Sequence, residues 1–444
     1  MTEDTESVTP KVHALRSEAA KLIGNTRISH GLVELEGLAN RLLDHLLVHE
    51  AVSILRFISE LHPSPRAWFN LAAALRMIGE LAEAMQWCES ALRDDPYFAP
   101  AYHLIGDLGD DAKCSEWLAS AEKLLDSAIL ESSEQAQLYY AIGQFKHKLG
   151  DHAGAFSRFS SGAAMLRRKQ IYRVEDDIET LSALRRTHSR SALELMKAGS
   201  SDRVGTFICG MPRSGTTLVE QLILRSLGTP LGEPRDFSIA LQQSWRNELS
   251  PTPRTRGELA TRLLELDANQ LGAAYLGLIS DIAGPGSHFV DKALENYISA
   301  GLITRALPNS RVILVRRSAR DRLASIYRCY FAGQYRYALD PIDLARYIRS
   351  FDQLADHWRD NLDPEKFMEV QYEEFVQSPA DQGRIIFNFL GLDREIMNSE
   401  TSTRQTLAVS ASATQIRSPI SRNSIAAWQC YEPWLQDALS LLND

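Results

Sequence analysis

The hydrophobic pattern of this 444-residue chain changes near Asp202, and the change limits which folds are possible. Before this point apolar residues recur at intervals of three and four, the spacing of an amphipathic helix. After it, short apolar runs alternate with helical stretches, which is typical of an α/β domain with a mainly parallel sheet. We therefore expect an all-helical region over residues 1–198 and an α/β domain over residues 203–444.

The helical region contains a weak internal repeat of about 33–34 residues. Its clearest copy runs from Arg66 to Pro96, and weaker copies precede and follow it. The residues at positions typical of a tetratricopeptide repeat are Trp68, Leu71, Ala72, Ala84, Ala91 and Pro96. A plain helical bundle is the alternative. Neither arrangement offers a catalytic constellation, so we expect this region to bind a peptide partner or to mediate self-association.

The second half predicts buried strands separated by helices. The apolar runs expected to form strands are residues 204–210, 287–293, 311–317 and 366–372. The segments expected to form helices are residues 217–227, 258–282, 320–331, 342–360 and 380–390. Two polar segments, residues 250–256 and 401–424, are expected to be loops because Ser, Thr, Arg and Pro are frequent in them.

The strongest local signal is the segment FICGMPRSGTTLVEQLIL, residues 207–224. An apolar strand, a glycine-containing turn and a helix follow one another, and this order directs backbone N–H groups at one anion. Gly215 allows the backbone to approach the anion, while Arg213 adds a permanent cation. The added hydroxyl donors are Ser214, Thr216 and Thr217. A glycine turn that binds no ligand is the alternative.

The turn lacks the lysine of a nucleoside-triphosphate loop. Gly210 and Gly215 have the spacing of G-x-x-x-x-G-K-[ST], but Thr216 stands where the lysine belongs. That lysine neutralises the β- and γ-phosphates, so its loss disfavours an ATPase or a kinase. A phosphosulfate fits better, because the transferred sulfuryl group has less charge and needs no magnesium clamp. We expect no metal.

Several motifs resemble those of sulfotransferases that use 3′-phosphoadenylyl sulfate (PAPS). PRSGTTL, residues 212–218, resembles their 5′-phosphosulfate loop. Residues 312–331 resemble their 3′-phosphate segment, although Ala319 replaces its usual proline. FVDKALENY and QYEEFVQSP resemble two further elements. The tail VSASATQIRSPISRNSIAAWQCYEP resembles bacterial sulfotransferases with tetratricopeptide repeats, and the nearest eukaryotic relatives by motif are tyrosylprotein sulfotransferases.

The resemblance implies PAPS as co-substrate and adenosine 3′,5′-bisphosphate as product. It assigns the residues from Arg213 to Thr217 to the 5′-phosphosulfate, with Arg213 also acting in catalysis. It assigns Arg317 and Ser325, eight residues apart, to the 3′-phosphate. Arg417, in the polar tail segment, would fold over the nucleotide.

Two further residues are expected to act in catalysis. Glu233 matches the G-E of the tyrosylprotein enzymes and is the expected base, with a surface carboxylate as the alternative. Arg235 stands one residue earlier than the family's arginine, so its part in the site is open. Lys292 ends a predicted strand and would stabilise charge on the leaving nucleotide. A salt bridge to Asp291 or Glu295 is its alternative.

Composition excludes several classes of protein. Lys and Arg total 48 against 57 for Asp and Glu, a net charge of -9 that disfavours general nucleic-acid binding. No run approaches the length of a membrane span, and five scattered cysteines with no C-x-x-C are typical of a reduced cytoplasmic protein.

The sequence thus predicts sulfuryl transfer to a hydroxyl on a protein tyrosine, a sugar or a small molecule. The alternatives are a kinase-like P-loop enzyme and a non-catalytic repeat scaffold with a degenerate transferase domain.

Overall fold

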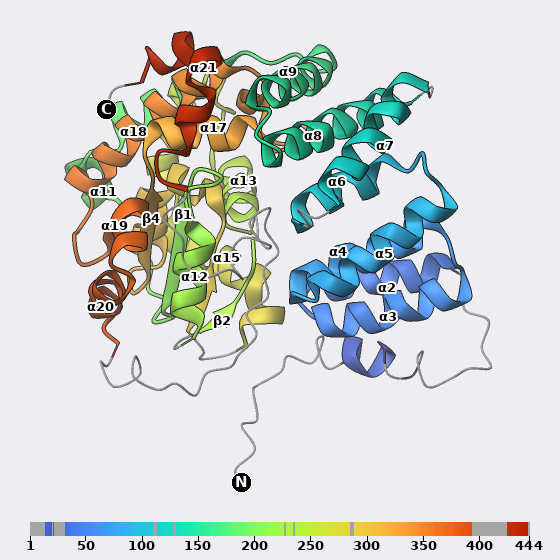
Figure 1. The fold of residues 1–444 in the computed structure, drawn as a ribbon. Coiled ribbons are helices and arrows are strands. Elements are labelled where there is room, and N and C mark those ends of the chain that lie inside the picture. The colour runs from blue at the N-terminus through green and yellow to red at the C-terminus, as the bar shows by residue number, and fades with distance from the viewer. Residues whose placement is uncertain are drawn as a thin grey trace.

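A computed structural model of the chain describes residues 14–19, 21, 32–109, 113–127, 130–225, 228–233, 236–284, 288–392 and 424–442. Figure 1 shows an all-helical part beside an α/β part, which confirms the expected fold class. Within those ranges, no helix has both the length and the apolar character needed to cross a bilayer.

The helical part consists of antiparallel pairs. Their bounds are α2 (Leu32–Asp44) and α3 (Val48–Leu61), α4 (Pro65–Ile78) and α5 (Leu81–Asp94), α6 (Ala99–Leu108) and α7 (Cys114–Ser127), and α8 (Ser132–Lys148) and α9 (His152–Arg168). The clearest predicted repeat is the α4–α5 pair. Ser64 caps α4 by accepting a hydrogen bond from the Ala67 amide, and Gly79 ends it with φ 90°. Ala72 and Ala84 are fully buried, so small residues lie in the repeat's core.

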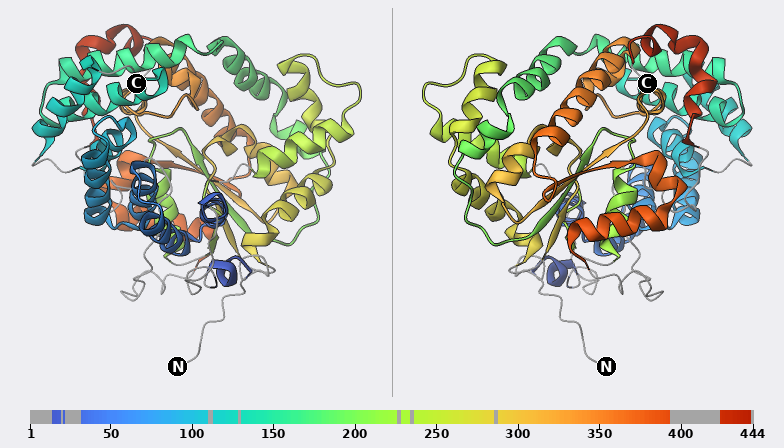
Figure 2. Two further views of the ribbon diagram at one scale, coloured as in Figure 1. Left: turned by 90° about the vertical axis from the view of Figure 1, so that its right-hand side faces the viewer. Right: turned by 90° about the vertical axis from the view of Figure 1, so that its left-hand side faces the viewer.

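The pairs form a curved array whose α4, α6 and α8 face the α/β part, with α5 and α7 on the outside (Figures 1 and 2). The array approaches the α/β part near both of its ends. Leu46 lies beside Gly232, since a Cβ built on that glycine would be 2.9 Å from the leucine side chain. Further along the array, the rings of His103 and Tyr140 lie 5.2 and 5.5 Å from the ring of Tyr330.

The α/β part has a five-stranded sheet in the order β2-β3-β1-β4-β5, and every neighbouring pair is parallel. The strands are β1 (Gly205–Gly210), β2 (Thr229–Pro230), β3 (Phe289–Asp291), β4 (Arg311–Arg316) and β5 (Phe367–Gln371). All four predicted strands are present. The sequence pattern missed β2, because two residues cannot show periodicity.

The predicted helices correspond to α12 (Thr216–Leu224), α15 (Ala268–Ala283), α17 (Ala319–Tyr327), α18 (Pro341–Asn361) and α20 (Pro379–Leu390). The helix predicted over 258–282 is divided, because Asp267 accepts hydrogen bonds from the amides of Asn269 and Gln270 and caps a new helix. Its first part is α14 (Arg256–Arg262) followed by η1 (Leu263–Glu265).

The remaining short elements are α10 (Val174–Thr187), α11 (Arg190–Leu195), α13 (Asp236–Glu248), η2 (Leu294–Ile298), α16 (Ala300–Ala306), η3 (Arg336–Leu339), α19 (Tyr372–Gln377), η7 (Ala427–Tyr431) and α21 (Glu432–Leu439).

One hydrophobic cluster crosses the junction between the two parts. It joins Phe159 of α9 and Leu181 of α10 to Phe207 of β1, Trp358 of α18 and Tyr431 of η7. A separate cluster fills the array from α2 to α8, and a third lies between the sheet and the pair α12 and α20. The last helices of the helical part therefore share a core with the sheet that positions the site.

Candidate active site

The loop between β1 and α12 adopts the tight turn that the sequence predicts. Positive φ angles occur at Gly210 (151°), the last residue of β1, and at Arg213 (65°) and Gly215 (96°) of the loop. A Cβ built on Gly215 would be 2.4 Å from the ring of Tyr372. Position 215 therefore requires glycine for two reasons: its φ is positive, and the Tyr372 ring leaves no space for a side chain. The loop leads directly into α12, whose N-cap residue is Gly215, so no side chain caps this end of the helix.

The buried hydroxyl of Ser214 is the feature of the loop that best fits an anion. Ser214 is fully buried, and its Oγ has no hydrogen-bond partner among the described residues. Leaving a buried polar group unpaired costs about 1–3 kcal/mol. Thr216 and Thr217 are also buried beside it. An anion in the loop would give the Ser214 hydroxyl an acceptor.

Arg317 and Ser325, the two residues predicted to bind a 3′-phosphate, both contact Arg213 of the loop. Arg317 follows β4, and its NH1 donates to the Arg213 carbonyl at 3.1 Å. Its guanidinium lies 4.8 Å from the centre of the Tyr372 ring, and its Nε has no partner among the described residues. Arg213 Nε in turn donates to Ser325 Oγ at 3.3 Å. The two predicted anion subsites therefore share Arg213.

Asp321 holds a distant segment of the chain beside Arg317. Its carboxylate accepts hydrogen bonds from the amides of Ala426 and Trp428 at 2.9 and 3.1 Å and lies 3.9 Å from Arg317. Arg317 also donates to the Ser424 carbonyl. Burial lowers the pKa of Arg317, and Asp321 opposes that effect.

Asp321 is not among the residues predicted for the site. The predicted residue Arg417 and the undecided Arg235 both lie outside the described residues.

Glu233 and Lys292 form an ion pair at the edge of the sheet where the loop lies. The chain after β2 continues alongside β3, since Leu231 N donates to Val290 O at 2.9 Å and Lys292 N to Gly232 O at 3.2 Å. This pairing brings the two side chains together. The alternative partners of Lys292, Asp291 and Glu295, form no ion pair with it in the described part of the chain.

A second carboxylate, missed in the sequence analysis, also contacts Lys292. Glu220 of α12 is buried, with Oε2 3.5 Å from Lys292 Nζ. Burial raises the pKa of Glu220 to about 7. Burial opposes the charge of Lys292, but Glu220 and Glu233 together raise its pKa. The sequence signal for Glu220 was one acid among the apolar residues of α12.

Asp291 and Asn296 explain the rest of the D-K-x-x-x-N element. Asp291 is fully buried and accepts hydrogen bonds from Tyr275 Oη at 2.7 Å and Asn296 Nδ2 at 2.9 Å. Burial raises the pKa of Asp291 to about 7. These bonds fix the end of β3 and so position Lys292. His288, by contrast, contacts Thr206 at the other end of β3, away from the loop.

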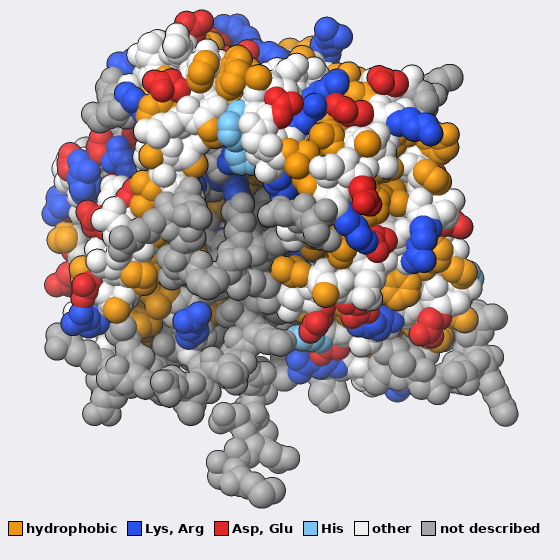
Figure 3. Space-filling view, in the orientation of Figure 1, with side chains coloured by type: hydrophobic (Ala, Val, Ile, Leu, Met, Phe, Trp, Pro, Cys, Tyr) orange, Lys and Arg blue, Asp and Glu red, His pale blue; other side chains and the backbone are white. Residues whose placement is uncertain are grey.

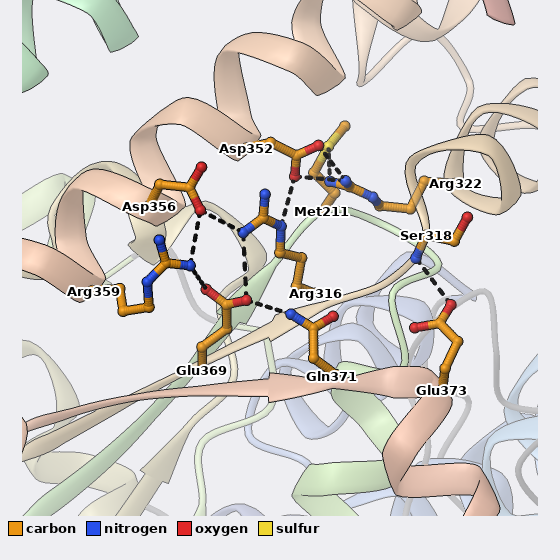
Figure 4. A network of polar contacts seen from close by, with 10 residues as sticks. All are labelled: Met211, Arg316, Ser318, Arg322, Asp352, Asp356, Arg359, Glu369, Gln371 and Glu373. Carbon is orange, nitrogen blue, oxygen red and sulfur yellow. Dashed lines mark hydrogen bonds and ion pairs between the residues drawn. The ribbon is translucent and has the colours of Figure 1, made fainter. Parts of the chain in front are cut away.

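Arg316 lies in the carboxylate network of Figure 4. Its Nε lies 3.0 Å from Asp352, and its NH1 lies 2.8 Å from Asp356 and 3.4 Å from Glu369. Arg322, which is 1% exposed, donates to both oxygens of Asp352 at 2.6 and 2.7 Å. The network ties α17 and α18 to the strand ends.

The same network supports the loop from behind. Arg322 NH1 contacts the sulfur of Met211 at 3.4 Å, and Met211 is the first residue after β1. The Ser318 amide donates to Glu373 at 2.9 Å, which ties the start of α17 to α19 (Figure 4). The loop therefore rests on side chains that are themselves held in place.

A cluster of His147, His152 and Cys430 joins α8 and α9 to the C-terminal segment, with its potential ligand atoms within 4.8 Å of one another. Arg328 NH1 lies 2.7 Å from His147 Nε2. An arginine can only donate, so Nε2 accepts and the proton of the neutral ring is on Nδ1. That nitrogen bonds Tyr431 Oη at 2.9 Å. The cluster is therefore built for hydrogen bonding between segments rather than for a metal.

Comparison with known proteins supports both halves of the sequence interpretation. Residues 206–395 match the family model described as Sulfotransferase family, and residues 37–97 match the one described as Tetratricopeptide repeat. An uncharacterized protein of Aquifex aeolicus is 25% identical over a match of 404 residues that covers 89% of this chain and 52% of that protein. The chain thus spans about half the length of this relative.

Among solved structures, the chain resembles the sulfotransferase domain from the Curacin biosynthetic pathway at 15% identity and a TM-score of 0.31. The match covers 54% of this chain and 99% of that one. It also resembles a sulfotransferase from Mycobacterium avium at 14% identity and a TM-score of 0.31, covering 73% of this chain and 94% of that one.

Proposed function

We propose that this chain, which combines a tetratricopeptide repeat with a domain of the sulfotransferase family, transfers a sulfuryl group from PAPS to an acceptor hydroxyl. The observation that carries the proposal is the fully buried hydroxyl of Ser214, which has no hydrogen-bond partner in the described part of the chain and lies in a loop at the start of a helix. Residues 203–444 would provide catalysis. Residues 1–198 would recruit the acceptor or mediate self-association.

The phosphosulfate end of PAPS would lie in the loop. The N–H groups at the start of α12, the Ser214 hydroxyl and the hydroxyls of Thr216 and Thr217 would surround it. Gly215 leaves room for the anion to approach the backbone. Arg213 is shared with the neighbouring subsite, so its charge can act on both ends of the nucleotide.

The 3′-phosphate would bind to Arg317 and Ser325. The Arg317 Nε, unpaired among the described residues, gives that phosphate a charge-assisted donor. Arg317 now contacts the Ser424 carbonyl, so the Ser424–Trp428 segment would adjust as the phosphate enters. We expect Arg417 to approach the nucleotide from the tail that precedes this segment.

Transfer would break the bond from sulfur to the oxygen that bridges it to the nucleotide, and form one from the acceptor oxygen to sulfur. Adenosine 3′,5′-bisphosphate leaves with the bridging oxygen, and the acceptor proton passes to Glu233. Lys292 would move from Glu233 toward the bridging oxygen, where negative charge develops. Glu220 would remain as the partner of Lys292, so the move frees Glu233 to act as the base.

The acceptor would be a protein, a glycan or a small molecule with a free hydroxyl. We place the enzyme in the cytoplasm, because its five cysteines are unpaired and such thiols persist in a reducing compartment.

Calorimetry with adenosine 3′,5′-bisphosphate and with AMP tests the nucleotide assignment. We expect tight binding of the bisphosphate without a divalent metal, and weaker binding of AMP. Incubation of sulfur-labelled PAPS with a cell extract, followed by separation of proteins, glycans and small molecules, tests the transfer itself. Preferential binding of ATP with magnesium would indicate a kinase-like enzyme instead, and binding of neither nucleotide would indicate a scaffold.

A further inference from the structure

The turn between α2 and α3 places a leucine where a helix of this kind usually ends in glycine. The Leu46 amide donates to the Leu43 carbonyl at 3.0 Å, and the Leu47 amide donates to the Leu42 carbonyl at 2.8 Å. This pair of hydrogen bonds ends a helix through one residue in a left-handed conformation, which is most often glycine. In α2 that residue is Leu46, with a φ of 58°.

Three other helices of the array, α4, α6 and α8, are followed by a left-handed glycine. Their φ angles are 90° at Gly79, 88° at Gly109 and 81° at Gly150. A left-handed conformation costs a residue with a Cβ free energy that glycine does not lose. Leu46 stands 33 residues before Gly79, which is the interval of the repeat. Leucine therefore occupies the position at which the next repeat has glycine.

The side chain of Leu46 packs against the backbone of Gly232 in the α/β part. A Cβ built on Gly232 would be 2.9 Å from Cδ2 of Leu46 and 3.4 Å from its Cδ1. Because Gly232 has no side chain, the leucine rests directly on its backbone. A glycine at position 46 would not make this contact, so the residue that is unfavourable for the turn is the one that reaches the α/β part.

Gly232 is linked to both members of the ion pair at the edge of the sheet. It directly precedes Glu233, and its carbonyl accepts a hydrogen bond from the Lys292 amide at 3.2 Å. The side chains of Glu233 and Lys292 form the ion pair described above. A shift of the Gly232 backbone would therefore move Glu233 relative to Lys292. A misplacement of about 1 Å can lower a catalysed rate by about 100-fold.

The array and the α/β part are joined by separate contacts. Figure 3 shows a hollow between the two parts in this face of the molecule, with basic side chains at its bottom. The ring contact of His103 with Tyr330 belongs to a later repeat, whereas Leu46 belongs to the first helical pair. The part that the first pair plays in the site can therefore be tested through Leu46.

We propose that Leu46 is a positioning residue for Glu233, holding the Gly232 backbone so that the carboxylate stays where it can take the acceptor proton. This inference rests on the proposed sulfotransferase function. It explains why leucine occupies a conformation that favours glycine, since strained residues persist where the site needs them. The first helical pair then takes part in catalysis without supplying a catalytic group.

Leu46→Gly separates positioning from stability. Glycine relieves the left-handed conformation while the apolar contact is lost, and these effects oppose each other, so the urea midpoint should stay close to that of the unmodified chain. Turnover of sulfur-labelled PAPS in a cell extract should nevertheless fall about 10-fold or more. Calorimetry should show unchanged affinity for adenosine 3′,5′-bisphosphate, because Leu46 contacts no residue of the loop between β1 and α12 in the described part of the chain.

Two further variants test whether the side chain itself is responsible. Leu46→Met keeps a long apolar side chain and should retain turnover within about 3-fold. Leu61→Ala is the matched control, because Leu61 is an exposed leucine at the far end of α3, and its turnover should not change. Normal turnover in Leu46→Gly, an equal loss in Leu46→Met, or a loss of bisphosphate affinity as large as the loss of turnover would each overturn the inference.

Hydrogen exchange gives a readout that needs no acceptor. In Leu46→Gly the Lys292 amide, which donates to the Gly232 carbonyl, should exchange faster than in the unmodified chain. The Val312 amide, which donates to the Lys366 carbonyl at 2.8 Å, should exchange as before. Equal exchange of the Lys292 amide in the two chains would contradict the positioning role. Failure of the proposed function is distinct, since the unmodified chain would then turn over no PAPS.

Discussion

Gly215→Ala tests whether the loop geometry underlies nucleotide binding. The new methyl group would meet the Tyr372 ring at 2.4 Å, and φ at this position is 96°. A left-handed conformation costs a non-glycine residue about 1–2 kcal/mol, and overpacking adds about 1–3 kcal/mol. The loop in its present shape would therefore be destabilised by about 2–5 kcal/mol.

The loop can relieve this strain only by moving, and a move displaces Ser214 and Arg213 from the anion site. Binding of adenosine 3′,5′-bisphosphate would then have to restore the strained shape, and each 1.4 kcal/mol spent in this way weakens affinity tenfold. We expect a loss of at least about 10-fold by calorimetry. Any strain that the loop does not relieve by moving should lower the stability of the folded chain, and with it the urea concentration at the midpoint of unfolding.

Gly277→Ala is the matched control. Gly277 lies within α15, and a Cβ built there meets nothing within 4 Å. Alanine at this position should stabilise the helix by about 0.5–1 kcal/mol and leave bisphosphate affinity unchanged. If Gly215→Ala behaved like this control in both measurements, the loop would not be the nucleotide site.

Four further changes test the rest of the site and the core beneath it. Arg317→Ala should weaken bisphosphate binding by roughly 10- to 150-fold in calorimetry and AMP binding very little; equal losses would remove its 3′-phosphate role. Glu233→Gln should lower turnover of labelled PAPS by about 100-fold or more with bisphosphate affinity retained, and normal turnover would exclude it as the base. In the folded state the pKa of Glu220 is raised to about 7 from its ordinary value of 4.5, so the folded state binds this proton more tightly than the unfolded state. The unmodified chain should therefore lose stability, up to about 3 kcal/mol, as pH rises from 4.5 to 7. Glu220→Gln should lack this loss in urea denaturation, and identical pH profiles would contradict the assignment. A chain beginning near Ser200 loses part of the core that crosses the junction, so size-exclusion chromatography should show aggregation. A monomer with normal bisphosphate affinity would show instead that the α/β part folds alone.

The parts of the candidate site whose geometry could be predicted from the sequence are those that depend on local order. The loop residues follow one another along a strand, a turn and a helix, and Arg317 and Ser325 lie on one strand end and the helix after it. Residues this close in sequence have relative positions that the local secondary structure determines. The family resemblance supplied Glu233 and Lys292, and the pairing of the chain after β2 with β3 brings those two side chains together.

The sequence could not reveal contacts between residues far apart in the chain. In the sequence Glu220 is one acid among apolar helical residues, and only the fold places Lys292 beside it. Asp321 bonds backbone amides, which leave no trace in a sequence pattern. An apolar helix face, as on α9 and α10, shows that a helix is buried but not what it packs against. The core shared across the junction is therefore a property of the tertiary structure alone.

The carboxylate network behind the loop also has a consequence for how relatives of this chain can diverge. Asp352 forms ion pairs with both Arg316 and Arg322, and Glu369 forms a further ion pair with Arg316. Losing Asp352 leaves the buried Arg322 without its ion-pair partner in the described part of the chain, which costs about 3–5 kcal/mol when the pair is buried. The four positions should therefore change together during evolution, and Asp352 and Arg322 most strongly, because Arg316 keeps Asp356 as a further partner. Across an alignment of relatives they should form a covarying group, while the exposed arginines of the outer helices drift independently.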